Sequence, residues 1–330
     1  MPRPTLSQAV TEYLEHCTAR RMSPQTIATR RSTLHRLVIS SGNPLVWSVN
    51  QKHVDRVFAQ HSWGPTTRNA KLSTYIGFFK WCRAKGYMHR DTDPLFGWKS
   101  EKLPKVNRLR IPQTEWHRLF QNCEHPNETM TIALGLYLFL RSSEKKQIRL
   151  RDVHLDRGEL DINRSKTDGF DVMPISVELD GYLRRHMTWL AENGCADPDH
   201  FLMPTQTRAK QRDGGKWIAG TGVIDPTRTF ARQYTLVQNV MVRAGYSVYQ
   251  EGGHTLRRSG ARAYFDVLVG QGYDGALKRV QSMLGHKSSA MTEHYLGLDI
   301  ERRQRNDALA GKPMFPVVHD AQIVPIREVM

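Results

Sequence analysis

The chain contains few cysteines and no long hydrophobic run, and these two scarcities exclude several classes of protein. Its four cysteines are scattered over 330 residues and include no Cys-x-x-Cys pair. Such spacing argues against a zinc site or a disulfide framework and favours a reducing compartment. No run of about 18 apolar residues could span a membrane, and the N-terminal residues lack the apolar core of a signal peptide. A cytoplasmic protein without a metal centre is therefore expected.

Acidic residues are also scarce relative to basic ones, and the imbalance lies at one end of the chain. The formal net charge is +16. Residues 1–112 contain 19 Lys and Arg against 6 Asp and Glu, whereas the remaining residues contain 29 against 26. This distribution predicts a polyanionic partner held by a basic first third, while the nearly balanced remainder has another task. A ribosomal-type basic protein could have a similar charge, so the charge alone does not decide the function.

The basic first third has the apolar periodicity of helices. Apolar residues recur at helical spacing over residues 6–17. Ser23-Pro24 and Gly64-Pro65 are helix starts, because proline is favoured in the first turn. Asp93-Pro94 closes the last helix, so a helical DNA-binding domain is predicted over residues 1–98. Its basic residues could form a merely solvated face, but we favour phosphate contact for Arg30, Arg31, Arg68 and Lys71.

Residues 99–112 are predicted to form a basic linker. They contain two prolines, several Lys and Arg residues and few apolar ones, which is typical of extended chain. The linker could lie along the DNA backbone, with Lys102 and Lys105 as its candidate contacts.

From residue 113 onward the pattern predicts a mixed domain that extends to residue 330. A very apolar helix is expected from about Thr129 to Leu140. Alternating apolar residues around an Asp168-Gly169 turn predict a β-hairpin over Glu159 to Pro174. Helices resume near Leu179 and around Phe230–Ala244, and residues 205–222 form a polar loop between them.

The last 80 residues contain a group of residues suited to phosphate chemistry. His254 and Arg257 are three residues apart at the expected start of a helix, where the helix dipole favours a bound phosphate. Leu284-Gly285-His286 ends another helix, with Gly285 as its C-terminal stop. Tyr295 follows nine residues after His286.

A further arginine belongs to this group. Arg141 directly follows the apolar helix and is spaced Arg-x-x-Glu with Glu144. A charged side chain at the end of an apolar helix needs a fixed partner, and Glu144 is expected to be the partner that supports Arg141.

Taken together, these pieces resemble the tyrosine recombinase (phage integrase) family over nearly the whole chain. Each short motif is weak alone, whereas the ordered set is specific. The family often has glycine where Phe139 stands, and the loop at 205–222 is longer than the family core requires. The matching pieces, in the family's order, are Arg141 with Glu144, Lys166 in the hairpin, His254-x-x-Arg257, Leu284-Gly285-His286 and Tyr295.

The resemblance implies a fold that is mainly α with a small β-sheet (α+β). A helical core-binding domain and a catalytic domain would form a C-shaped clamp around duplex DNA. The arm-binding domain of more elaborate phage integrases is not expected.

The resemblance also implies site-specific recombination without any cofactor. Tyr295 would attack the DNA and leave a 3′-phosphotyrosine and a free 5′-hydroxyl. His254 would accept or relay the tyrosine proton, and Lys166 would protonate the leaving oxygen. A packing role for Tyr295, a cap for His254 and an ordinary turn for Lys166 are the alternatives.

Transition-state charge would be neutralised by side chains. Attack on a phosphodiester adds negative charge to the nonbridging oxygens, which two guanidiniums can clamp. Arg141 and Arg257 would supply this clamp. His286 would donate a further hydrogen bond, unless it is an ordinary core histidine.

The implied partners are double-stranded DNA with paired inverted core sites, a homotetramer on that DNA and, as a further candidate, a directionality factor. The apolar end of the tail at 300–330 is expected to dock on a neighbouring protomer or back on its own domain. A type IB topoisomerase and a non-catalytic DNA-binding regulator are the alternative functions. A tetramer on paired sites distinguishes the recombinase from the topoisomerase, and a covalent adduct distinguishes both from the regulator.

The charge asymmetry predicts where DNA affinity resides. Residues 113–330 alone should bind DNA weakly and with a much shallower salt dependence than the full chain, because fewer counterions are released. The measurement is the slope of log affinity against log salt concentration for both proteins. Equal slopes would contradict the assignment of DNA binding to the first third.

Overall fold

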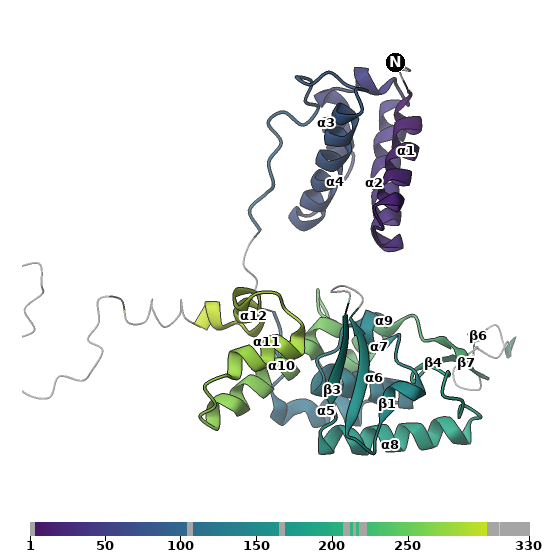
Figure 1. The fold of residues 1–330 in the computed structure, drawn as a ribbon, viewed down its shortest axis with the longest axis vertical. Coiled ribbons are helices and arrows are strands. Elements are labelled where there is room, and N and C mark those ends of the chain that lie inside the picture. Colours follow the sequence, from purple (N-terminus) through teal and green to yellow (C-terminus); the bar gives the residue numbers. More distant parts are fainter. Residues whose placement is uncertain are drawn as a thin grey trace, which may run out of the picture. The chain divides into compact units, whose positions relative to one another are not determined.

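The computed structural model describes residues 4–103, 108–164, 169–206, 212–213, 216–217, 223–301 and 310 (Figure 1). Two compact units divide between Val106 and Asn107, within the predicted linker. The architecture is mainly helical with small antiparallel sheets, which confirms the predicted α+β class. Across these described ranges, no helix is both long and apolar enough to cross a membrane.

The first unit is helical in its described part, as predicted. Ser23 caps the second helix and Pro24 begins it, while Pro65 begins the fourth. The buried core includes Tyr75 and Phe78. Its elements are α1 (Leu6–Ala19), α2 (Pro24–Ser41), the 3-10 turn η1 (Val46–Ser48), α3 (Gln51–Ala59) and α4 (Pro65–Ala84).

The second unit mixes helices with short strands. Its helical elements are η2 (Gln113–Glu115), α5 (Trp116–Gln121), α6 (Pro126–Tyr137), α7 (Ser142–Lys145), η3 (Leu150–Asp152), α8 (Val177–Glu192), α9 (Gln233–Arg243), α10 (Gly253–Gly270), α11 (Ala276–Leu284) and α12 (Ser289–Leu296). Its strands are β1 (Val153–His154), β2 (Glu159–Arg164), β3 (Gly169–Pro174), β4 (Pro204–Gln206), β5 (Arg212–Asp213), β6 (Lys216–Trp217) and β7 (Ile224–Thr229).

The predicted hairpin is confirmed as β2 and β3. The strands pair antiparallel from Glu159 opposite Pro174 to Arg164 opposite Gly169, and β1 extends the sheet beside β2. The turn that carries Lys166 lies outside the described residues, as do most of the loop at 205–222 and nearly all of the tail after Glu301.

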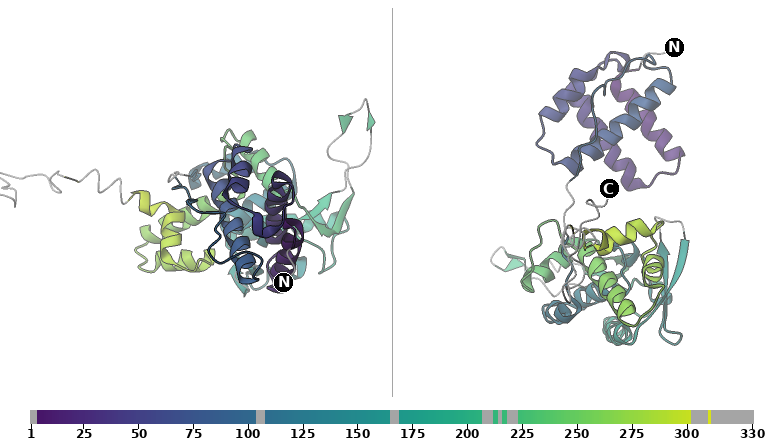
Figure 2. Two further views of the ribbon diagram at one scale, coloured as in Figure 1. Left: turned by 90° about the horizontal axis from the view of Figure 1, so that it is seen from above. Right: turned by 90° about the vertical axis from the view of Figure 1, so that its left-hand side faces the viewer.

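The centre of the second unit is the crossing of α6 and α10. Helix α6 is almost completely buried, and a glycine on α10 permits the two backbones to meet. A Cβ atom at Gly260 would lie 1.9 Å from the Leu136 carbonyl oxygen and 2.8 Å from the Phe139 ring. Because α10 carries His254 and Arg257 in its first turns, this crossing positions them. Helices α10, α11 and α12, coloured green to yellow, also pack against one another (Figure 2).

Helix α6 ends at Tyr137, three residues before the predicted Leu140. The reason is Phe139, whose φ of 55° is left-handed and cannot continue a right-handed helix. The chain therefore leaves α6 before it reaches Arg141.

Gly260→Ala should lower the free energy of unfolding by several kcal/mol, because the new methyl group meets backbone that cannot move alone. Urea denaturation of the full chain measures the change. Gly270→Ala is the matched control in the same helix, since a Cβ atom there meets nothing within 4 Å. Equal losses in both variants would contradict the close crossing.

Candidate active site

The second unit brings together residues that are far apart in the chain. Five of the six predicted catalytic residues lie in its described part, and Lys166 lies outside it. Arg141 caps α7, His254 and Arg257 lie in the first turns of α10, His286 follows the end of α11, and Tyr295 lies in α12.

Two arginines of the site share the same acceptors. The Arg141 backbone N–H and guanidinium each donate to Glu144, at 2.6 Å. Arg257 lies 3.6 Å from Oε2 of Glu144, the carboxylate oxygen that also accepts the Arg141 backbone N–H. Both guanidiniums also donate to the Leu284 carbonyl, at 3.3 Å from Arg141 and 2.5 Å from Arg257. Glu144 and one main-chain carbonyl therefore hold two like charges side by side.

The electrostatics keep this cluster charged. Burial would raise the pKa of Glu144, but the Arg141 backbone hydrogen bond and the charge of Arg257 lower it below its ordinary value. Burial lowers the pKa of Arg257 to about 10, so its guanidinium still carries a proton at neutral pH. The site thus presents two fixed positive charges against one negative charge.

Phe139 supports Arg257 through its backbone. Its carbonyl accepts a hydrogen bond from the Arg257 guanidinium. The left-handed φ of 55° that aims this carbonyl costs about 1–2 kcal/mol in a non-glycine residue. The ring is buried against Ala261 and Tyr264, and this burial offsets the strain. The position where the family often has glycine therefore has the backbone conformation that glycine favours.

The Tyr295 hydroxyl lies beside His254. It donates to the His254 carbonyl oxygen at 3.3 Å and lies 3.5 Å from His254 Nδ1. The tyrosine ring is edge-on to His286, with centroids 5.3 Å apart, and the Arg257 guanidinium is 5.9 Å from the ring centroid. Burial raises the pKa of Tyr295, and Arg257 is the strongest of the charges that oppose the rise. Its hydroxyl is therefore protonated at neutral pH.

His286 is neutral in this environment. Burial and the nearby charges of Arg257 and Arg141 together lower its pKa to about 4, with burial as the largest cause. Its Nδ1 lies 3.2 Å from the Thr292 hydroxyl oxygen. A neutral imidazole still has one N–H to donate, so His286 can form a hydrogen bond to a phosphate oxygen.

Arg164 connects the hairpin to this cluster, and the sequence analysis missed it. Its guanidinium donates to Asp171 across the hairpin at 2.6 Å and to the Met283 carbonyl at 2.8 Å. Strand β2 is therefore fixed to the end of α11 at the residue before the turn that carries Lys166. The sequence contains no signal for this contact, because its acceptor is a main-chain oxygen 119 residues away.

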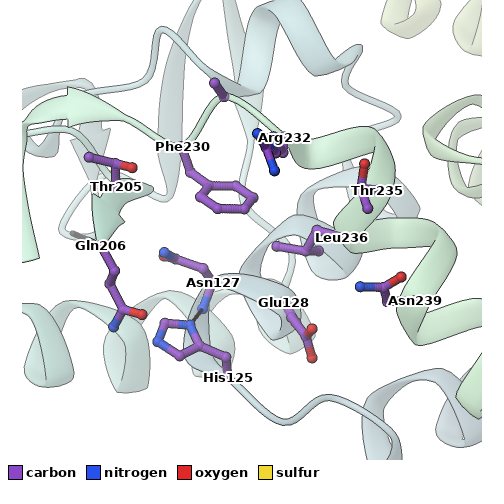
Figure 3. A pocket seen from close by; sticks show the side chains of 11 residues that line it. His125, Asn127, Glu128, Thr205, Gln206, Phe230, Arg232, Thr235, Leu236 and Asn239 are labelled. Carbon is purple, nitrogen blue, oxygen red and sulfur yellow. Dashed lines mark hydrogen bonds between the residues drawn. The ribbon is translucent and has the colours of Figure 1, made fainter. Parts of the chain in front are cut away.

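A separate cavity of about 530 Å³ lies between the start of α6, strand β4 and the start of α9 (Figure 3). His125, Gln206 and Phe230 line it, and none of the predicted catalytic residues does. Among the residues that the structure describes, no group of His, Cys, Asp or Glu side chains could hold a metal ion.

Three of the predicted DNA-contacting residues have partners within the first unit. Arg30 donates to the Tyr13 hydroxyl at 2.8 Å, and Lys71 donates to the Thr33 hydroxyl at 3.0 Å. Arg68 forms an ion pair with Glu101 at 2.5 Å. These contacts give the three side chains a structural role, and their contact with DNA stays a prediction.

The other three predicted contacts differ in their surroundings. Arg31 and Lys102 are exposed, and Lys105 lies outside the described residues. Arg31 and Lys102 are therefore the better-placed candidates for phosphate contact.

The chain is similar to proteins of known family and known structure. The Phage integrase family matches residues 110–302, which is more than half of the chain. Tyrosine recombinase XerC of Chromobacterium violaceum is 24% identical over 306 residues, covering 90% of this chain and 92% of that protein. A lambda integrase (75–356) dimer bound to a COC′ core site has a TM-score of 0.64 at 19% identity, covering 88% of this chain and 95% of that chain. A lambda integrase tetramer bound to a Holliday junction has a TM-score of 0.62 at 18% identity, covering 86% and 78%. These structural likenesses establish the fold.

Lys145 is a buried cation beside the site that the sequence analysis also missed. It is 1% exposed, and its ammonium group donates to the Thr131 carbonyl of α6 at 3.0 Å. Burial lowers its pKa to about 7, because removal from water disfavours the charged form.

Lys145→Met should stabilise the protein most at low pH. The folded-state pKa of Lys145 is about 7 and its ordinary value is 10.5, so wild-type stability should rise between these values by up to about 1.4 kcal/mol per pH unit. The variant lacks this rise, so its advantage should be largest below pH 7 and shrink toward pH 10. Urea denaturation at several pH values measures it, with Lys146→Met as the control for the loss of one charge. A pH-independent difference would contradict a buried, titrating Lys145.

Proposed function

The chain belongs to the phage integrase family and is a tyrosine recombinase, and we propose that Tyr295 is the nucleophile with which it cuts and rejoins DNA. The observation that carries this proposal is that the Tyr295 hydroxyl lies beside His254, while the Arg257 guanidinium, which shares Glu144 and the Leu284 carbonyl with Arg141, lies 5.9 Å from the centroid of the tyrosine ring. The substrate is double-stranded DNA, and each cleavage leaves a 3′-phosphotyrosine and a free 5′-hydroxyl.

Arg141 and Arg257 bind the scissile phosphate in this proposal. As the tyrosine oxygen attacks phosphorus, charge builds on the nonbridging oxygens, and guanidiniums match these oxygens with paired N–H donors. Because Glu144 and the Leu284 carbonyl already hold both groups in place, they need little rearrangement when charge develops. His286 adds a neutral hydrogen-bond donor.

His254 receives the proton of the nucleophile. Ionising a tyrosine of pKa about 10 at pH 7 costs roughly 4 kcal/mol, and burial makes the cost larger here. The exposed imidazole of His254 lies 3.5 Å from the hydroxyl through its Nδ1, so a slight approach makes it the acceptor.

Lys166 is proposed as the general acid. The leaving 5′-oxygen is a poor leaving group and needs a proton as the P–O bond breaks. Strands β2 and β3 lead to and from the turn that carries Lys166, and Arg164 fixes this end of the hairpin to the site. The phosphotyrosine bond retains the energy of the broken bond, so religation needs no nucleotide.

We propose that four protomers act on two DNA sites, each site with paired inverted core sequences. The lambda integrase tetramer bound to a Holliday junction supports this assembly by its shared fold. A directionality factor as regulator, and a C-terminal tail at 300–330 that docks on the neighbouring protomer, belong to the same proposal. Action on DNA would place the protein in the cytoplasm, on the nucleoid of a bacterial or phage-infected cell.

Tyr295→Phe should abolish covalent adduct formation while leaving DNA binding almost intact, because only the nucleophilic oxygen is lost. Nicked suicide DNA, resolved with the protein on a denaturing gel, detects the adduct, and a gel shift measures binding. Tyr249→Phe is the matched control, since Tyr249 is a more exposed tyrosine of the same unit at 80% exposure. Adduct formation by the Tyr295→Phe variant would show that another residue is the nucleophile.

A further inference from the structure

The helix that carries Tyr295 is short and ends immediately after it. Helix α12 spans Ser289–Leu296, and Gly297, with φ of 83°, stops it. The Gly297 N–H bonds to the carbonyls of Glu293 and His294. The carbonyls of Tyr295 and Leu296 have no such partner within the helix, as is general at helix C-termini. A helix of this length is marginal without outside contacts.

Two arginines from other elements bind these last carbonyls. Arg110 donates to the Tyr295 carbonyl at 3.1 Å, and Arg262 of α10 donates to the Leu296 carbonyl at 3.3 Å. Positive charge at a helix C-terminus is also favoured by the helix dipole. A Cβ atom on Gly297 would lie 2.7 Å from the Arg110 guanidinium carbon. The glycine that stops the helix thus also leaves the space that Arg110 occupies.

Arg110 belongs to a strap, residues 108–111, that also binds the start of α10. The Leu109 N–H donates to Glu251 at 3.1 Å, and the Ile111 N–H donates to the Ser259 hydroxyl at 2.8 Å. Glu251 lies directly before α10 and accepts the Thr255 hydroxyl at 2.6 Å. The strap therefore connects the end of the nucleophile helix to the helix that carries His254 and Arg257.

We propose that Arg110 positions Tyr295 for attack on the phosphate. Arg110 holds the backbone of the nucleophile residue itself, and the rest of the strap fixes this point relative to α10. Misplacement of a reacting group by about 1 Å can slow a reaction by roughly 100-fold. Arg110 is a positioning residue, because its contacts are with the tyrosine backbone and not with the reacting atoms. The proposal rests on the assignment of Tyr295 as nucleophile.

The chain offers a matched control for Arg110. Arg118 donates to the Ala244 carbonyl at 2.9 Å at the end of α9, and the adjacent Gly245 also has φ of 83°. A Cβ atom on Gly245 would lie 3.1 Å from the Arg118 guanidinium. Arg118→Ala therefore removes the same kind of helix cap at a helix that carries none of the catalytic residues.

The first measurement is the rate of covalent adduct formation by the full chain on nicked suicide DNA. Arg110→Ala should slow it by roughly 10- to 100-fold, Arg110→Lys should recover part of the rate, and Arg118→Ala should stay close to wild type. DNA binding, measured by gel shift, should be the same in all of them. A normal adduct rate in Arg110→Ala would overturn the proposal.

The second measurement separates positioning of the nucleophile from support of the phosphate clamp. In Tyr295→Phe, hydrogen peroxide serves as an external nucleophile that attacks the phosphorus and expels the 5′-oxygen. Adding Arg110→Ala to that variant should leave peroxide cleavage unchanged, since α12 no longer supplies the attacking atom. An equal slowing of peroxide cleavage would overturn the proposal and assign Arg110 to the clamp. Adduct formation by Tyr295→Phe alone would instead refute the proposed function.

Discussion

The buried carboxylate of Glu144 is the contact on which the rest of the site depends. It is 2% exposed and forms ion pairs with two guanidiniums that would otherwise repel each other. A buried charge without a counter-charge is destabilising, and Glu144 supplies the negative charge beside Arg257, which is 1% exposed. Because Arg141 follows α6 and Arg257 lies in the first turns of α10, the ion cluster and the Gly260 crossing both connect these two helices.

Main-chain carbonyls are the second means by which the site is assembled. Arg257 binds the carbonyl of Phe139, both arginines bind that of Leu284, and Arg164 binds that of Met283. Arg110 and Arg262 bind the last carbonyls of α12 in the same way. Each of these guanidiniums is therefore fixed relative to a main-chain segment by a hydrogen bond to its carbonyl oxygen. The geometry of the candidate site follows from how helices end, and a shift of any one helix end would move a charged group.

Several features could be predicted from the sequence because their causes are local. Ser23-Pro24 starts a helix, Gly285 ends one in the left-handed conformation, and alternation around residues 159–174 forms the hairpin. The ordered motif predicted which residues belong to one candidate site, and the structure brings those that it describes close together; their catalytic roles stay a prediction. The end of α6 was predicted three residues too late, because a left-handed conformation is uncommon for a phenylalanine and the sequence does not show it.

By itself the sequence determined the helical first third, the charge asymmetry, the hairpin and the identity of the candidate catalytic residues. Only the tertiary structure decided that Arg30, Arg68 and Lys71 bind inside the first unit, that Lys145 is buried, and that Arg110 holds the Tyr295 backbone. The physical reason is that every residue has a carbonyl oxygen, so a sequence does not show which one a distant arginine or lysine will bind. That choice is made when helices far apart in the chain pack together.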